Sequence, residues 1–423
     1  MKRKNVAVIL TVATVLGTMM GSMPVQAAKS EDEEITLTMI DHTSEDIKIE
    51  WEDSVVEGFM EEHPNVTIEV QRMSMDDYTQ TIATKFASDD APDIFVEDSS
   101  TLPIYIKNGY VADITDTDAV GRMTEGACEA LSQDGKVYAL PVSSNSYVVT
   151  YNKTVFEDAG ITEVPKTAEE FYADCDKLKE AGYTPIELGY KDTWVLMGDF
   201  QTDYINNVLT KDPEAVTKLQ DRSEKWADSE EWKAVVERLK ERYSNANADP
   251  FGTDWASACT ALATGECGMI LNGDWTSNNA AAYGDVSDFG AFALPVTDNA
   301  DDAKIAKLAG GQGYCLNANS ENLDMAKEFL NYMTSDGCVE NYIENCNEVC
   351  LVDGASAENA TGSLADVMDL RENNSVVYTG VVNFDNEFSD AVLDCLSDYL
   401  LSDSDADTAL KALDTEFDRI AGK

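Results

Sequence analysis

The sequence predicts an α/β fold, because strand-like and helix-like patterns alternate along the chain. Apolar residues alternate with polar ones over 35–39 and 66–70, as in half-buried strands. Over 47–59 and 78–86 they instead recur about every fourth residue, which is one face of a helix. Strands that alternate with helices of this length predict a mostly parallel sheet.

The same alternation runs to the end of the chain. A buried-type strand is predicted at 94–96, and extended runs follow at 137–142 and 148–151. Thr167 and Glu170 have the spacing of a capping box that begins a helix. Later elements are predicted as strands at 269–271 and 314–316, a helix ending at Gly265, and helices around 232–239, 325–333, 388–399 and 410–420.

The N-terminus has the features of a secretory signal peptide. Basic residues at 2–4 precede an apolar stretch at 6–16, and small residues at 25–27 favour cleavage after Ala27. A retained membrane anchor is the alternative, but the stretch is shorter than the roughly 20 apolar residues that span a bilayer. We therefore expect residues 1–27 to be removed and the protein to be exported. The remainder (423 − 27 = 396 residues) has the length of two or three domains.

The charge and the catalytic motifs narrow the class of function. The chain has 80 acidic and 30 basic residues, and its net charge of −50 opposes binding to nucleic acid or anionic lipid. It has no G-x-S-x-G, H-E-x-x-H, S-x-x-K or Walker motif, and its only histidines are His42 and His63. A glycosidase needs just two carboxylates, so a secreted carbohydrate-active hydrolase stays open as an alternative.

The nine cysteines permit three interpretations. First, the cysteines that lie on predicted apolar helix faces are interpreted as small hydrophobic residues buried in the core. One or two disulfides are the usual expectation for an exported chain, and Cys346 and Cys350 are close enough in sequence to form one, or to begin a metal site. The cysteines on predicted helix faces are Cys175, Cys259, Cys338 and Cys395.

Two further motifs have plain structural explanations. Asp403, Asp405 and Asp407 resemble the start of a calcium loop, but Thr408 stands where that loop needs glycine and Asp414 where it needs glutamate. Acidic residues that begin the last helix explain them better. The glycine-rich run at 310–313 is predicted to be a close turn before a strand, not a phosphate loop. No metal and no cofactor are expected.

Two tryptophans follow predicted strands and have carboxylates beside them. Trp275 comes next to Asp274, and Trp194 lies two residues after Asp192. Sugars present an apolar C–H face and a rim of hydroxyls, so their sites combine flat aromatic rings with Asp, Glu and Asn side chains. A single tryptophan belongs more often to a core, but two in this setting favour a carbohydrate site.

Several stretches, taken in order and spacing, carry a family resemblance over almost the whole mature length. The chain resembles the carbohydrate-type (family 1) extracellular solute-binding proteins of ABC importers, the group that includes maltose-binding protein. The stretches are FMEEHPNV at 59–66, APDI at 91–94, GYVADIT at 109–115, YALP at 138–141, YNK at 151–153, TGECGM at 264–269, NGDW at 272–275 and AKEFL at 326–330.

The resemblance implies a type II periplasmic-binding-protein fold, with two α/β lobes joined by a hinge and the ligand cleft between them. Residues 31–142 and 311–350 would form the N-terminal lobe, and 147–309 and 360–423 the C-terminal lobe. The implied function is capture of an oligosaccharide, without catalysis, and its delivery to the membrane permease subunits of an ABC transporter. A surface sugar-binding adhesin without a permease is the other alternative.

The resemblance also implies a location and an oligomeric state. A monomeric protein in the periplasm or at the cell surface is expected. Relatives from single-membrane bacteria usually carry a Leu-x-Gly-Cys lipid-attachment site, but the signal region here has no cysteine, so lipid anchoring is not expected.

Carried over position by position, the resemblance implies a set of ligand-binding residues. Trp275 matches the stacking tryptophan of the family, and Asn145 falls in the hinge segment. His42 has an equal alternative as a solvated loop residue. The resemblance also implies a contribution from Asn383, Phe384 and Asp385 in the far segment, of which Asp385 enters the set. The implied set is Asp41, His42, Glu97, Asp98, Asn145, Asp192, Trp194, Asp274, Trp275, Gly311 and Asp385.

Overall fold

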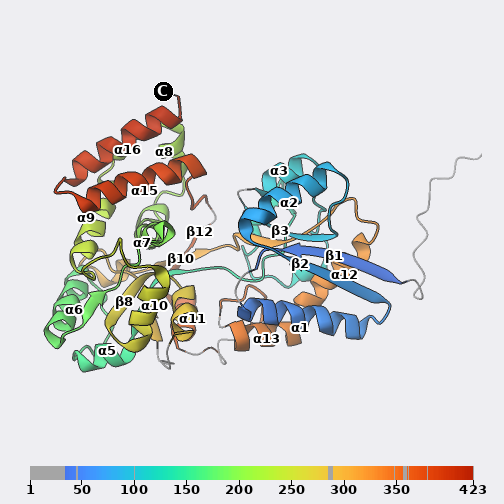
Figure 1. The fold of residues 1–423 in the computed structure, drawn as a ribbon, viewed down its shortest axis with the longest axis horizontal. Helices are drawn as coiled ribbons and strands as arrows, with labels where there is room; N and C mark the ends of the chain where they lie inside the picture. The colour runs from blue at the N-terminus through green and yellow to red at the C-terminus, as the bar shows by residue number, and fades with distance from the viewer. Residues whose placement is uncertain are drawn as a thin grey trace, which may run out of the picture.

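The protein has two α/β lobes, seen side by side in the computed structural model (Figure 1). The predicted signal peptide lies outside the described residues. Within the described part of the chain, no helix is long and apolar enough to cross a membrane. The structure describes residues 34–43, 46–99, 101–283, 289–346, 348–355, 360, 362–378 and 380–422.

The first lobe is built on a four-stranded sheet that is mostly parallel, as predicted. β1 runs parallel to both β2 and β3, whereas β11 is antiparallel to β3 because the chain enters it from the other lobe. Successive side chains point to opposite faces. Leu37 therefore packs with Phe59 on one face, and Ile40 packs with Tyr78 on the other. The strand order is β11 (Gln312–Leu316), β3 (Ile94–Asp98), β1 (Ile35–Asp41) and β2 (Val66–Arg72).

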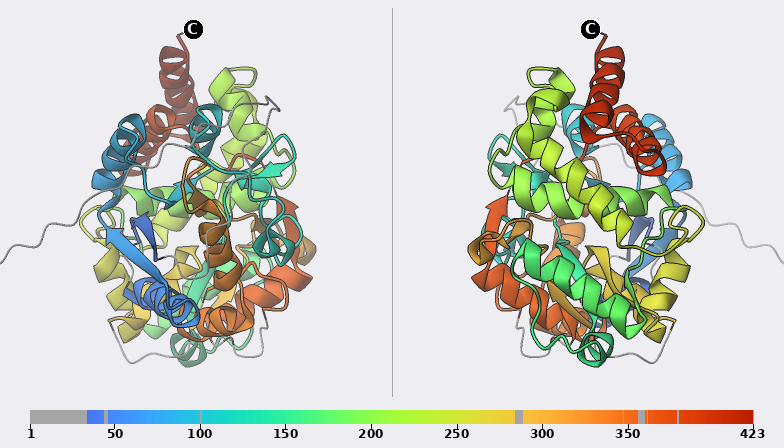
Figure 2. Two further views of the ribbon diagram at one scale, coloured as in Figure 1. Left: turned by 90° about the vertical axis from the view of Figure 1, so that its right-hand side faces the viewer. Right: turned by 90° about the vertical axis from the view of Figure 1, so that its left-hand side faces the viewer.

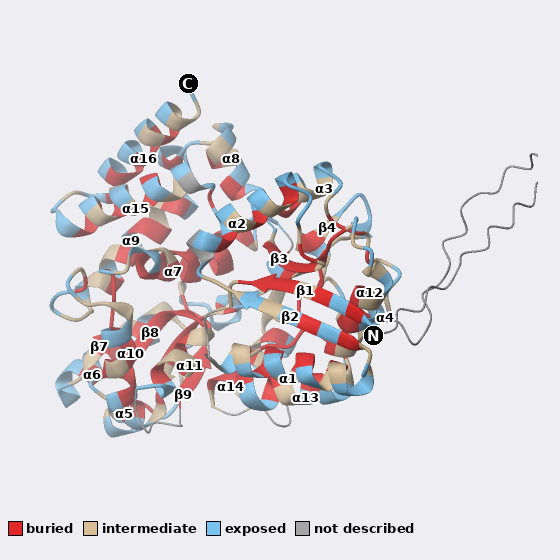
Figure 3. Cartoon of the chain, turned by 45° about the vertical axis from the view of Figure 1, so that its right-hand side comes forward, coloured by how far each residue is buried: buried red, intermediate tan, exposed pale blue. Residues whose placement is uncertain are grey.

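Helices cover both faces of this first sheet, and the buried residues gather on the strands and on the inward helix faces (Figure 3). The predicted helices over 47–59 and 78–86 are confirmed as parts of longer helices. The helices of this lobe are α1 (Asp46–Glu62), α2 (Met75–Ala87), α3 (Leu102–Lys107), α4 (Asp118–Gly121), α12 (Leu323–Met333) and α13 (Asp336–Cys346).

The second lobe contains a four-stranded sheet for which the expectation of parallel strands is wrong. β6 is antiparallel to both β8 and β9, and only β7 and β8 are parallel. The cause is the path of the chain, since β6 leads away from the connection with the first lobe and β8 returns toward it. The strand order is β7 (Thr184–Ile186), β8 (Cys267–Gly273), β6 (Tyr147–Asn152) and β9 (Phe289–Phe292).

The helices of the second lobe include two local predictions that the structure confirms. Thr167 and Glu170 form the capping box at the start of α6, and Gly265 ends α10 in the left-handed conformation (φ 74°). The C-terminal pair α15 and α16 pack together on this lobe (Figures 1 and 2). The helices are α5 (Lys153–Asp158), α6 (Ala168–Ala181), α7 (Thr193–Tyr204), α8 (Ala215–Asp221), α9 (Glu230–Ser244), α10 (Trp255–Thr264), α11 (Trp275–Ala281), α14 (Ser363–Asn373), α15 (Asn386–Leu401) and α16 (Ala406–Ile420).

The extended run predicted at 137–142 is mostly not a strand. Only β5 (Lys136–Val137) pairs regularly, with β4 (Ser132–Gln133). Beyond it, Leu140 forms an isolated bridge with Tyr314. Pro141 follows and has no N–H to donate to a ladder. This part of the chain therefore connects the lobes in an extended conformation with few sheet bonds.

The cysteine and acidic motifs have structural roles. None of the nine cysteines, all of which are described residues, forms a disulfide, and seven of them are buried. Burial in apolar surroundings raises the pKa of Cys175 and of Cys259 to about 12. Asp405 is the N-cap of α16, where its carboxylate accepts a hydrogen bond from Thr408 N at 2.9 Å. The interpretation of this acidic stretch as the start of a helix is confirmed.

Candidate functional site: a cleft between the lobes

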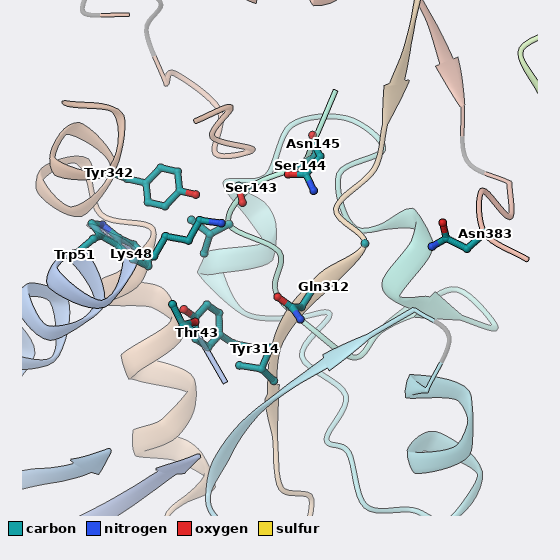
Figure 4. Close-up of a pocket in the computed structure, with 14 residues that line it drawn as sticks. Thr43, Lys48, Trp51, Ser143, Ser144, Asn145, Gln312, Tyr314, Tyr342 and Asn383 are labelled. Carbon is teal, nitrogen blue, oxygen red and sulfur yellow. The ribbon is translucent and has the colours of Figure 1, made fainter. Parts of the chain in front are cut away.

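A cavity of about 360 Å³ lies where the two lobes meet. Its walls come from α1, β3, β11 and α13 of the first lobe, from the connection at 142–145, and from Asn383 of the second lobe. Trp51, Lys48 and Tyr342 stand on one side of it and Asn383 on the other (Figure 4). The lining residues are Thr43, Lys48, Trp51, Val96, Val142, Ser143, Ser144, Asn145, Gly311, Gln312, Gly313, Tyr314, Tyr342 and Asn383.

The chain connects the lobes three times beside this cavity: between β5 and β6, between β10 (Ile305–Leu308) and β11, and between α13 and α14. Two of these connections are bonded to each other. Leu351 N donates to Val142 O at 2.8 Å, and Ser144 N donates to Val349 O at 3.3 Å. Extended segments with so few bonds are the usual site of hinge rotation between domains.

Arg371 of α14 holds two connections together. Its Nη1 donates to Ser146 Oγ at 3.0 Å, and its Nη2 donates to Leu308 O at 3.4 Å. The arginine is buried, and burial lowers the pKa of its guanidinium, with Asp274 opposing that shift. Because the buried guanidinium makes a hydrogen bond to each connection, it fixes where each of them leaves the second lobe.

The floor of the cavity rests on a buried charge cluster. Tyr314 lines the cavity and donates its hydroxyl to Glu52 Oε1 at 2.9 Å. Arg72 donates from Nε to the other oxygen of Glu52 at 3.0 Å, and its guanidinium lies 3.7 Å from Asp41. Burial, reinforced by Asp41, raises the pKa of Glu52 to about 7 although Arg72 opposes the shift.

Ser144 offers the cavity an unused hydroxyl. The residue is 5% exposed and lies in the connecting segment that lines the cavity. Its Oγ has no hydrogen-bond partner among the described residues. A buried hydroxyl without a hydrogen-bond partner costs free energy. A ligand group that bonds to this hydroxyl removes that cost and therefore binds more tightly.

The wall on the second-lobe side is a chain of polar and aromatic contacts. Gln201 Nε2 donates to Asn383 Oδ1 at 2.8 Å, and Tyr147 donates its hydroxyl to Gln201 Oε1 at 3.1 Å. The ring of Tyr147 meets Trp275 edge-on, with centroids 5.7 Å apart. Asn383 is therefore held in place by a network that leads outward to Trp275.

Three residues of the implied set lie at the cavity or one contact from it. Asn145 and Gly311 line it directly. His42 Nε2 lies 3.0 Å from Nε2 of Gln312, which is a lining residue, and its ring packs edge-on against Tyr78. The structure brings these three positions together from just after β1, from the first connection and from just before β11.

Three others lie behind the cavity in the first lobe. Asp41 belongs to the charge cluster under Tyr314, and Glu97 and Asp98 end β3 without lining the cavity. Glu97 accepts a hydrogen bond from the Thr101 hydroxyl, and burial raises its pKa to about 7. Asp98 Oδ1 accepts from Thr101 N at 3.1 Å. Each of these carboxyl groups has a partner within the protein, but Oδ2 of Asp41 and Oε1 of Glu97 have no hydrogen-bond partner among the described residues.

Asp274 and Trp275 lie at the junction between β8 and the first connection. Asp274 Oδ2 accepts from Ser146 N at 2.9 Å, and burial raises its pKa to about 7. The Trp275 ring covers Gly273 so closely that a Cβ on that glycine would lie 1.9 Å from the indole. Neither residue lines the cavity described above, but Trp275 adjoins it through Tyr147.

The remaining three residues of the set lie farther from the cavity. Asp192 accepts from Trp255 N at 2.8 Å, and Trp194 is 45% exposed at the start of α7. Asp385 is exposed at the start of α15, where its N–H donates to Gln220 Oε1 at 2.6 Å. Asn383, two residues earlier, is the one that reaches the cavity.

Three helix residues of the first lobe line the cavity, although the sequence pattern does not predict them as part of the site. Trp51 is 3% exposed and donates from Nε1 to Cys338 O at 3.0 Å, and it lies on the apolar face of α1 that the sequence spacing predicts. Lys48 lies one turn earlier and pairs with Glu348 at 3.0 Å. Tyr342 comes from α13, almost 300 positions away in the sequence. Only the three-dimensional packing brings them together.

Two lobes, three connections and a cavity between them define the class of protein: a solute-binding protein of the type II periplasmic-binding-protein fold. The model of the family described as bacterial extracellular solute-binding protein matches residues 45–337, and the chain belongs to this family. A solved structure of a chitin oligosaccharide binding protein has the same fold, with a TM-score of 0.75 at 19% identity, covering 92% of this chain and 99% of that one.

Two curated relatives are similar over most of their length. The diacetylchitobiose binding protein DasA of Streptomyces coelicolor is 28% identical over 313 residues, which are 72% of this chain and 70% of DasA. The multiple sugar-binding protein of Streptococcus mutans is 24% identical over 327 residues, which are 75% of this chain and 76% of that protein. Both names describe binding proteins and not enzymes.

Proposed function

We propose that this protein captures an oligosaccharide in the cleft between its lobes and delivers it to the permease subunits of an ABC transporter. The observation that carries the proposal is the cavity itself, which is lined from both lobes and from a connecting segment. Hydroxyl and amide side chains supply most of its polar groups, and the aromatic rings of Trp51, Tyr314 and Tyr342 lie beside them. The sugars in the names of the two curated relatives support the same class of ligand.

The chemistry of this cavity suits a polyhydroxylated ligand. Amides such as Asn145, Gln312 and Asn383 donate and accept at once, as sugar hydroxyls do, and aromatic rings cover the apolar face of a pyranose. Because Asn383 comes from the second lobe and the other two do not, a ligand that bonds to all three favours closure. The closed form is then the one that the permease recognises.

The proposal includes the organisation implied by the family resemblance. The lobes are proposed to be 31–142 with 311–350, and 147–309 with 360–423, after removal of the signal peptide at Ala27. The whole implied residue set is retained as a proposal for the closed, ligand-bound form. The protein is proposed to act as a monomer outside the cytoplasm, without catalysis and without a lipid anchor.

A thermal-shift screen of the mature chain against oligosaccharides tests the proposal. A ligand that binds only the native state stabilises it by about 2.7 kcal/mol at a hundredfold excess over its Kd. We expect a shift with one class of glycan, and chromatography should recover that glycan intact. Cleavage of the glycan would reveal a hydrolase. A shift with peptides or polyamines and with no sugar would overturn the proposed ligand class.

A further inference from the structure

Lys48 is the only charged residue among the described residues that line the cavity. The other lining side chains carry hydroxyls, amides, aromatic rings or aliphatic groups, and none of them is a carboxylate. Lys48 lies in the first turn of α1, and Thr43, just before this helix, also lines the cavity. The start of α1, where the helix dipole places partial positive charge, is therefore at the cavity as well. The cavity surface itself carries positive charge, in a protein whose net charge is −50.

Glu348 holds the Lys48 ammonium group from outside the cavity. Its Oε1 lies 3.0 Å from Lys48 Nζ, and its Oε2 accepts a hydrogen bond from the Tyr342 hydroxyl at 2.6 Å. Glu348 does not line the cavity, and its side chain is 11% exposed, against 27% for Lys48. Because the ion pair fixes the position of the ammonium group, little side-chain entropy is lost when a ligand bonds to it.

The Lys48 side chain is directed toward the connection between the lobes. Figure 4 shows it extended past Tyr342, with its nitrogen turned toward the side of the cavity where Ser143 and Ser144 lie. Ser144 is buried, and its hydroxyl has no hydrogen-bond partner among the described residues. A cation and a buried hydroxyl that can donate suit a ligand group that only accepts hydrogen bonds, and a carboxylate is such a group.

The negative charge beneath the cavity is balanced by a cation. Under Tyr314, Arg72 bonds to Glu52 at 3.0 Å and lies 3.7 Å from Asp41. Charges on the protein surface act weakly at longer range, because 0.1 M salt screens exposed charges over about 10 Å. The net charge therefore opposes a polyanion, whereas a single carboxylate at Lys48 interacts chiefly with the groups around it.

We propose that the ligand is an acidic oligosaccharide, in which the carboxylate of a uronic acid unit pairs with Lys48 and accepts a hydrogen bond from Ser144. This inference rests on the proposed function and names the class of sugar. A hexuronic acid carries a carboxylate at the carbon where a neutral hexose carries CH2OH, so the two units have nearly the same size. The volume of the cavity cannot distinguish them, but Lys48 can, since a charge-assisted hydrogen bond is about twice as strong as a neutral one.

Calorimetric titration of the mature protein with matched pairs of sugars tests the inference. The panel contains di- and trisaccharides of galacturonic, glucuronic and mannuronic acid, each beside the same sugar after chemical reduction of its carboxyl groups to CH2OH. All titrations are made at one ionic strength. We expect one acidic sugar to bind about tenfold or more tightly than its reduced form, which is the ratio that a charge-assisted hydrogen bond supplies.

Substitutions at the ion pair should change this ratio in opposite directions. Lys48→Met removes the cation, so the ratio should fall to about one, whereas Lys48→Arg keeps the charge and should retain most of the preference. Glu348→Gln keeps an acceptor for the Tyr342 hydroxyl but removes the negative charge that competes for Lys48, so the ratio should rise about threefold. If the three substitutions instead weaken binding of both forms equally, the ion pair has only a structural role and the inference is wrong.

Lys85→Met is the matched control for Lys48→Met. The side chain of Lys85 on α2 is 28% exposed and pairs with Asp90 at 3.0 Å, but it does not line the cavity. The control changes the net charge by the same amount and should leave the ratio unchanged. Equal affinity of the wild type for the acidic and reduced forms would overturn the inference while leaving the proposed function intact, as would a preference that Lys48→Met retains. The absence of binding to any oligosaccharide would overturn both.

Discussion

Tyr314 donates its hydroxyl to Glu52 at 2.9 Å, so a residue that lines the cavity is supported from below by a buried carboxyl group. Arg72 and Asp41 lie on the other side of that carboxyl group. Burial of Glu52 raises its pKa to about 7, so its protonation changes near neutral pH. The stability of the protein should therefore depend on pH in this range.

We predict that the protein is more stable at pH 5 than at pH 8. Burial raises the pKa of four carboxyl groups to about 7, and each then binds more protons in the native than in the unfolded state between about pH 4 and 7. The free energy of unfolding therefore falls as the pH rises through this window. Calorimetry should show Tm falling by several degrees, at about 2–4 °C per kcal/mol. The four groups are Glu52, Glu97, Glu187 and Asp274.

Glu52→Gln should make this dependence on pH shallower, because it removes one of the four groups. Glu57→Gln is the control, since Glu57 is exposed on the same helix and should leave the slope unchanged. A Tm that rises from pH 5 to pH 8 in the wild type would contradict the prediction.

We predict that Arg371→Met destabilises the protein by about 2–4 kcal/mol. The substitution leaves Ser146 Oγ and Leu308 O without their donor and removes the positive charge near Asp274. Denaturant unfolding followed by circular dichroism measures the loss. Arg419→Met, at an exposed arginine paired with Glu416, should cost less than about 1 kcal/mol. Equal effects of the two substitutions would refute a special role for Arg371.

Much of the first lobe could be predicted because its elements have one buried face. The apolar spacing from 47 to 59 is visible since polar residues cover the outer face of α1. α7 was not predicted, because it is buried on nearly all sides and its acidic residues look solvent-exposed in the sequence. Asp199 and Asp203 are in fact buried, and Arg242 bonds to them at 2.7 and 3.1 Å. No periodic contrast marks such a helix.

The site was predictable only where a local motif or the family resemblance marked it. Asn145 and Gly311 were placed in this way, and both line the cavity. Ser144 lies next to Asn145 and has no motif of its own. Trp51 and Tyr342 lie on apolar helix faces, so the sequence pattern assigns them to the core. The antiparallel pairing of β6 and β8 was also hidden, since the direction of each strand depends on where the chain crosses between the lobes.

We predict that Ser144→Ala weakens binding of the ligand about three- to tenfold without destabilising the free protein. The hydroxyl is buried without a partner among the described residues, so its removal relieves an unmet hydrogen bond in the free state and deletes one in the complex. Titration calorimetry should show the weaker binding, and thermal unfolding should show that the free protein is not destabilised. Ser88→Ala, at the exposed end of α2, should change neither value. Reduced stability together with unchanged affinity would show that Ser144 serves only the fold.

We predict that Trp275→Ala weakens binding of every oligosaccharide by about 1 kcal/mol or more, the scale of a lost stacking contact and its burial. Trp275 adjoins the cavity through Tyr147, so its removal should affect short and long ligands alike. Its ring also covers Gly273, so a small decrease in Tm is expected, without unfolding. Titration of a disaccharide and a longer glycan into Trp275→Ala measures the effect, and Tyr283→Ala, at an exposed tyrosine just after α11, is the control. Unchanged affinity in Trp275→Ala would show that this tryptophan does not contact the ligand. Asn383 would then be the outermost contact on the second-lobe side of the cleft.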